Sequence, residues 1–132
     1  MSEKLRFTNL PNTGDARGSS FTISPAILSF LGRIADVHVS TLLPGHVRGN
    51  HFHTRKNEVL IVLRQSEWSL HWDNGEGTPV QVKQFSGQGA EVVLIEPGSS
   101  HAVRNIGASE LTIIALNSEA YDPREVIPRK VT

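Results

Sequence analysis

Hydrophobic and polar positions change their pattern at Ile34, after which short runs of β-branched, leucine and aromatic residues alternate with glycine, proline and asparagine. Runs of this length bounded by turn formers predict strands. A series of short strands at such spacing is typical of a sandwich or a barrel, so the chain is assigned to the all-β class. The predicted strands span residues 34–43, 47–53, 58–64, 68–73, 80–85, 91–95, 101–105 and 111–116.

Two local signals refine this pattern. Residues 73–77 read Asp-Asn-Gly-Glu-Gly, and asparagine and glycine tolerate the positive φ angles of a tight hairpin. Ser24 precedes a proline, and Gly32 follows a short apolar stretch. A capping serine, a proline in the first turn and a closing glycine predict one short helix.

The chain has 132 residues, which is enough for one compact core and too few for two domains. Residues 1–20 are rich in turn formers and poor in apolar residues, so we expect a flexible arm that needs a partner surface to become ordered. Residues 21–132 then form a single domain. Exposed strand edges are usually covered, and together with the polar arm they predict a homodimer in which the arm pairs with a partner's sheet.

Composition excludes several functions. Thirteen basic residues balance thirteen acidic ones, so no net field attracts nucleic acid or an anionic membrane. No apolar run approaches the ~20 residues of a membrane helix, and Met1 to Leu10 contains no signal-type apolar stretch. We therefore expect a cytoplasmic protein that binds a small molecule. Cysteine is absent, which leaves nitrogen and oxygen as the only strong metal ligands.

Histidine spacing suggests a metal site. His51 and His53 are two residues apart on a predicted strand, so both side chains share one face. Glu58 follows a segment that can turn the chain back, and His101 follows a bend at Gly98. Three imidazoles and one carboxylate suit one divalent transition metal (Zn, Fe, Mn or Ni) better than Ca or Mg. Alternatively, the His-x-His pair has two solvated imidazoles.

Other polar and aromatic side chains are candidates for a ligand pocket. Tryptophan can pack in the core or stack on a ring, and arginine can stay solvated or clamp a phosphate or carboxylate. A lone histidine or tyrosine can transfer protons or have a purely structural role. The candidates for substrate binding are Arg48, Arg64, Trp68, Trp72 and Asn105, and those for proton transfer are His46, His71 and Tyr121.

Residues 45–58 resemble the first motif of the cupin family, in which a glycine, His-x-His and a glutamate recur at fixed spacing. Gly98, His101 and Asn105 resemble the second motif. Two departures are Gln65 in place of the closing glycine of the first motif and Glu96 in place of a proline in the second. The resemblance covers residues 34–117 and implies a double-stranded β-helix, or jelly-roll, barrel.

A narrower resemblance comes from residues 48–53, Arg-Gly-Asn-His-Phe-His, together with residues 15–19 and 119–123. These segments are similar to the cupin domain of capsular-polysaccharide nucleotide-sugar epimerase/reductases and, more distantly, to sugar-nucleotide ketoisomerases. The resemblance implies isomerisation or epimerisation of a keto-sugar or nucleotide-sugar. Because one fold hosts many reactions, two alternatives remain: an Fe or Ni dioxygenase, and a non-catalytic module that binds or senses a small molecule.

Overall fold

A computed structural model describes residues 3–132, and this part of the chain folds almost entirely into strands. The all-β prediction is confirmed, and the eight predicted strands correspond to β2–β9 with small shifts at their ends. In chain order the elements are β1 (Leu5–Asn9), α1 (Pro25–Leu31), β2 (Asp36–Leu42), β3 (Val47–His53), β4 (Glu58–Arg64), β5 (Trp68–Trp72), β6 (Gln81–Phe85), β7 (Gly89–Ile95), β8 (His101–Asn105), β9 (Leu111–Asn117), the 3-10 helix η1 (Pro123–Glu125) and β10 (Val126–Pro128).

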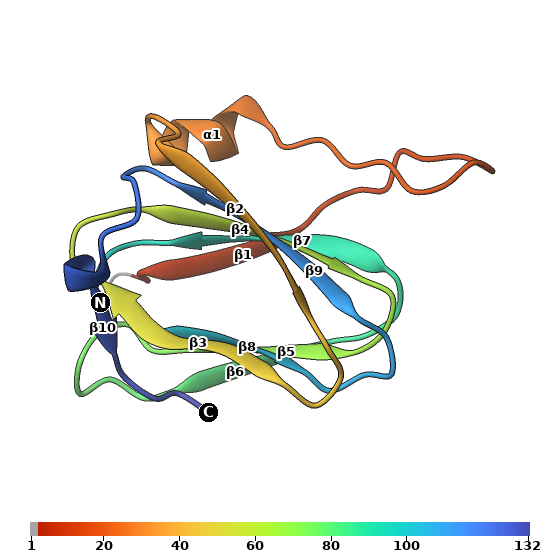
Figure 1. The fold of residues 1–132 in the computed structure, drawn as a ribbon. Helices are drawn as coiled ribbons and strands as arrows, with labels where there is room; N and C mark the ends of the chain where they lie inside the picture. Colours follow the sequence, from red (N-terminus) through yellow and green to blue (C-terminus); the bar gives the residue numbers. More distant parts are fainter. Residues whose placement is uncertain (1–2) are drawn as a thin grey trace.

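The strands form two antiparallel sheets that face each other (Figure 1). One sheet has the order β1-β7-β4-β9-β2 and the other the order β10-β3-β8-β5-β6. Side chains from both inner faces fill the space between them, including Leu60, Trp68, Leu70 and Val93. This arrangement agrees with the jelly-roll barrel expected from the two sequence motifs.

The short helix covers the outer face of the first sheet (Figure 1). Its boundaries confirm the capping prediction, because the Ser24 hydroxyl accepts a hydrogen bond from the Ile27 amide (3.4 Å) and Gly32 ends the helix with a φ of 76°. Leu31 packs with Val59 and other apolar residues of that face. Within residues 3–132 no helix has the length and apolar character needed to cross a membrane.

The N-terminal arm is more ordered than predicted. Leu5–Asn9 form β1, which pairs with β7 of the same chain, with Leu5 opposite Ile95. The expectation that the whole arm needs a partner surface is therefore wrong for these residues, because Leu5 and Phe7 pack against the chain's own core cluster. Residues 11–20 leave the body as an exposed excursion (Figure 1), closed by a bridge between Asp15 and Gly18.

Candidate metal centre

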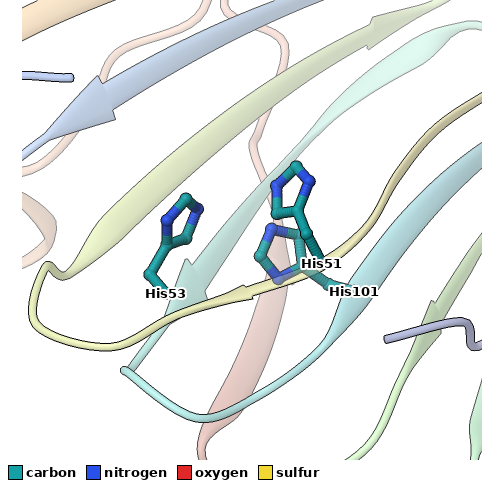
Figure 2. A group of neighbouring side chains, drawn as sticks. All are labelled: His51, His53 and His101. Atoms are coloured by element: carbon teal, nitrogen blue, oxygen red, sulfur yellow. The ribbon is translucent and has the colours of Figure 1, made fainter. Parts of the chain in front are cut away.

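Strands β3 and β8 bring three histidines together. His51 lies directly opposite His101 in the β3–β8 register, and His53 follows two residues later on the same face of β3. One ligand nitrogen from each ring can be chosen such that all three lie within 4.8 Å of one another. Figure 2 shows the three rings projecting from β3 and β8 toward one another.

Glu58 completes the predicted set from the opposite sheet. Its carboxylate oxygen Oε1 lies 3.2 Å from Nε2 of His101 and 3.6 Å from Nε2 of His53. Glu58 is the first residue of β4, and residues 54–57 carry the chain from one sheet to the other. Glu58 thus meets His53 and His101 between the two sheets, and a ring nitrogen of His51 lies within 4.8 Å of ring nitrogens of both of these histidines.

A close approach of β3 to β8 sets the position of His51. The register shifts between Gly49 and His51, and Asn50 has a φ of 61°. A Cβ atom on Gly49 would lie 2.5 Å from the carbonyl oxygen of His101. Glycine is therefore required here, because any larger residue would push apart the two strands that carry the histidines.

Hydrogen bonds fix the tautomers of two of the rings. Nδ1 of His53 lies 2.9 Å from the carboxylate of Glu125, and Nδ1 of His101 lies 3.0 Å from the carbonyl oxygen of Ser99. Both partners can only accept, so each Nδ1 carries the hydrogen. Each Nε2 is then directed toward Glu58 with its lone pair, which is the usual orientation of a histidine that binds a metal.

The C-terminal segment, residues 122–132, holds the parts of the chain that carry these ligands. Glu125 accepts hydrogen bonds from the amides of Arg55 (3.0 Å) and Lys56 (3.1 Å), and β10 pairs with β3. Arg129 donates two hydrogen bonds to Asp73 (2.8 and 2.7 Å) and lies 4.3 Å from the ring centre of Phe52. Sequence reasoning missed Glu125, because it lies outside both motifs and no spacing relates it to them.

The arrangement suits a bound cation. Nε2 of His53 is buried without a hydrogen-bond partner, and it faces the same carboxylate oxygen as Nε2 of His101. A proton on each nitrogen, or one metal ion between them, would satisfy these groups. Burial and the charges of His101 and His53 lower the pKa of His51 to about 4, so this imidazole is neutral at physiological pH. Burial opposes ionisation of Glu58, but the adjacent imidazoles of His101 and His53 lower its pKa below the usual range.

A cavity of about 610 Å³ opens beside this cluster. Its buried end includes Lys56, Glu58 and His53, whereas Tyr121 is 71% exposed at its outer end. A smaller cavity of about 120 Å³ shares His38, His51, Glu58 and Ala115 with it. The larger cavity is lined by Asp36, Val37, His38, His51, His53, Lys56, Glu58, Ala115, Asn117, Tyr121 and Val126.

Two of the residues predicted to bind substrate or transfer protons line these cavities. Arg48 lines the smaller one, where its Nε donates a hydrogen bond to the carbonyl oxygen of Thr41 (3.0 Å). Tyr121 lines the larger one. His38 also lines both cavities, although its position in the sequence gave no reason to select it.

Three further candidates lie away from both cavities. Trp68 stacks on Phe85 with ring centres 4.6 Å apart, and Trp72 meets Phe7 edge to face at 5.6 Å. Both tryptophans are buried in the barrel core. Asn105 is fully buried and donates hydrogen bonds to the carbonyl oxygens of Leu42 (2.9 Å) and Ser109 (2.8 Å). The structure therefore supports the packing alternative for these residues.

Arg64 is bound inside the protein. Its Nε donates to one oxygen of the Glu91 carboxylate (2.6 Å) and its Nη2 to the other (3.1 Å). Nη1 donates to the carbonyl oxygens of Ser86 and Gly87. Because four of its five N–H groups are engaged with these partners, the side chain is held inside the protein and does not extend toward a ligand.

The two histidines proposed for proton transfer also lie elsewhere. His46 is exposed in the turn before β3. His71 is buried, and its Nε2 lies 2.8 Å from the hydroxyl of Ser69. It alternates with Trp68 and Trp72 of β5 and so faces outward from the barrel core.

Comparisons with known proteins agree with this architecture. The model of a family described as polysaccharide biosynthesis C-terminal domain matches residues 14–126. A comparison with curated protein sequences finds no match.

Among solved structures, the chain is similar to the capsular polysaccharide assembling protein CapF from Staphylococcus aureus, with 27% identity and a TM-score of 0.66. The match covers 92% of this chain and 34% of CapF, so the chain spans about a third of that protein.

Two smaller proteins share the fold. NovW from Streptomyces spheroides, a 4-keto-6-deoxy sugar epimerase, is 21% identical with a TM-score of 0.74, and the match covers 94% of this chain and 68% of NovW. The 3,4-ketoisomerase QdtA from Thermoanaerobacterium thermosaccharolyticum, solved with TDP-4-keto-6-deoxyglucose, is 17% identical with a TM-score of 0.72. That match covers 96% of this chain and 88% of QdtA.

Proposed function

The chain belongs to the polysaccharide biosynthesis C-terminal domain family, and from this premise we propose that it isomerises or epimerises a nucleotide-linked keto-sugar beside its ketone. The observation that carries the proposal is the cavity of about 610 Å³ with the histidine and glutamate cluster at its buried end. The substrate class comes from the reaction named for NovW and from the reaction and the bound TDP-4-keto-6-deoxyglucose of QdtA.

The same cluster is proposed to hold one divalent transition metal (Zn, Fe, Mn or Ni) through His51, His53, Glu58 and His101. The support is the pair of oriented Nε2 atoms and the carboxylate oxygen that both of them face. When bound, such an ion acts as a Lewis acid that polarises a carbonyl oxygen.

Proton transfer is assigned to His38. This residue lies on β2, in the other sheet from β3, and lines both cavities. Its imidazole takes the proton from the carbon beside the ketone, and the electron pair of the broken C–H bond forms the enolate. A proton delivered to the opposite face of that carbon from the hydroxyl of Tyr121, which lines the same cavity and exchanges with solvent, gives the epimer. Movement of the ketone to the neighbouring hydroxyl-bearing carbon instead requires that the former ketone carbon gains a proton and that the neighbouring hydroxyl loses its proton.

We expect the protein to exchange a ring hydrogen of TDP-4-keto-6-deoxyglucose for deuterium in heavy water, as followed by mass spectrometry and proton NMR. Loss of a positioned general base typically costs 10²–10⁴-fold, so His38→Asn should slow the exchange by about 100-fold or more. His46→Asn is the matched control, because His46 is exposed outside both cavities.

Two results would contradict the assignment. Exchange at the wild-type rate in His38→Asn would exclude His38 as the base. Tight binding of the nucleotide-sugar by the wild type without any exchange would indicate a binding module in place of an enzyme.

A homodimer is also proposed. β2 is an edge strand of its sheet, and Val37, Val39 and Leu43 are 53%, 61% and 57% exposed. An apolar edge of this kind is usually covered. Light scattering should give twice the chain mass of 14.5 kDa, whereas the mass of one chain would exclude a stable dimer.

A further inference from the structure

Lys56 is a buried cation beside the histidine cluster. The residue is only 4% exposed and lines the larger cavity. It shares this cavity with His51 and His53. Among residues 3–132 no carboxylate lies within 4.0 Å of it, and no side-chain hydrogen bond of Lys56 is formed. The ammonium nitrogen itself is not fully enclosed, so it reaches the cavity and can donate hydrogen bonds to a ligand oxygen there.

The acidic groups of this cavity are already engaged. Glu58 faces His53 and His101, and Asp36 accepts hydrogen bonds from Asn117 (2.8 Å) and from the amide of Tyr121 (2.9 Å). Of the residues that the structure describes, Lys56 is the only lysine or arginine that lines the larger cavity. Among the described residues no acidic side chain pairs with Lys56, so a molecule that enters the cavity can supply its counter-charge.

Asn117 supplies a hydrogen-bond acceptor to the same cavity, whereas Lys56 supplies a donor. Its amide nitrogen donates to Asp36, which fixes the orientation of the side chain and leaves the oxygen Oδ1 buried without a partner. Asn117 is 4% exposed and lies opposite Glu58 in the β4–β9 register. A buried acceptor without a donor costs free energy, so this oxygen is suited to a ligand hydroxyl.

We propose that Lys56 and Asn117 form a subsite for an α-hydroxyketone, in which the ammonium of Lys56 donates to the ketone oxygen and Oδ1 of Asn117 accepts from the adjacent hydroxyl. This inference rests on the proposed function and names the part of the sugar that is recognised. A nucleotide diphosphate fits this position less well, because its two charges would meet one buried cation beside the carboxylates of Glu58 and Asp36.

The assignment gives Lys56 a role in the reaction. When the proton beside the ketone is removed, negative charge develops on the ketone oxygen. A fixed ammonium directed at that oxygen stabilises the transition state more than the substrate. The charge of Lys56 therefore contributes to both selectivity for a ketone and the rate of proton exchange.

The test compares two ligands by calorimetry, TDP-4-keto-6-deoxyglucose and the same nucleotide-sugar with a hydroxyl in place of the ketone. We expect wild type to bind the ketone more tightly and Lys56→Met to lose this preference, with deuterium exchange slowed at least tenfold. Lys56→Arg should retain part of the preference. Asn117→Ala should weaken both ligands equally, because each has a hydroxyl beside the varied position. Lys83→Met, on the exposed face of β6, is the matched control.

Circular dichroism and metal content establish that each variant is folded and loaded. A folded Lys56→Met protein with wild-type preference and exchange would overturn the subsite and leave the proposed function intact. Failure of the wild type itself to bind the keto-sugar or exchange deuterium would overturn both.

Discussion

Glu58→Gln should lose the bound metal while keeping the fold. The substitution preserves the shape of the side chain but removes the only negative charge offered to the ion by the proposed ligand set. Loss of a partner outside the ligand set already costs roughly 10–100-fold in metal affinity, so loss of a ligand should cost more. Wild type purified without a metal-affinity tag should contain about one equivalent of a transition metal, and the variant almost none, by plasma mass spectrometry.

Substitutions at two further glutamates should give intermediate and unchanged metal affinities for comparison. Glu125→Gln should keep the metal with an affinity lowered by roughly 10–100-fold, because glutamine has no charge and only one acceptor oxygen to serve both the ring of His53 and the amides of Arg55 and Lys56. Glu110→Gln, at an exposed position, should match the wild type. Competition with a chromogenic chelator measures all three affinities.

Metal uptake by the wild type decides the proposal in the other direction as well. A wild-type protein that takes up none of Fe, Mn, Ni or Zn would show that the metal proposal is wrong. The imidazoles would then satisfy Glu58 with their own protons, and the sugar chemistry would have to proceed without an ion.

Arg64→Met should reduce the free energy of unfolding by about 3–5 kcal/mol, the usual cost of removing one partner of a buried ion pair. Glu91 is 0% exposed, and after the substitution only the amide of Asn9 would still donate to its carboxylate (2.9 Å). Urea denaturation measures the change. If Arg64 makes no contact with substrate, the folded variant should exchange deuterium at the wild-type rate.

Two further variants test whether the loss of stability comes from the burial of the ion pair or from its charges alone. Arg17 also forms an ion pair, with Asp15 (2.8 Å), but its side chain is 91% exposed. Arg17→Met should therefore leave the midpoint of urea denaturation unchanged. Arg64→Met combined with Glu91→Leu should recover part of the loss, because no buried charge is then left without a partner. A single Arg64→Met variant as stable as wild type would contradict the importance of the pair.

Much of the fold was readable from the sequence. The strands carrying Val59–Val62 and Trp68–Trp72 are apolar runs between turn formers, and their positions do not depend on distant residues. Ser24 and Gly32 define a helix through local capping. β1 was missed because it is short and followed by a long polar stretch, and its stability comes from pairing with β7.

The candidate metal ligands were also predictable, because His51 and His53 share a strand face by local geometry alone. Arg64 and the tryptophans were not, since a polar or aromatic side chain on a strand can face a pocket or a packed core, and only its neighbours decide which. In the folded protein Trp68 stacks on Phe85, and Arg64 forms an ion pair with Glu91.

Local sequence patterns were enough to locate the turns and to show which side chains share a strand face. Tertiary structure alone decided that Glu58 meets the histidines from the opposite sheet, that Glu125 orients His53, and that Lys56 and Asn117 share one cavity. These relations join segments up to 72 positions apart, and they depend on sheet packing and on the path of the C-terminal segment. No local propensity encodes such contacts, because they form only when the two sheets close on each other.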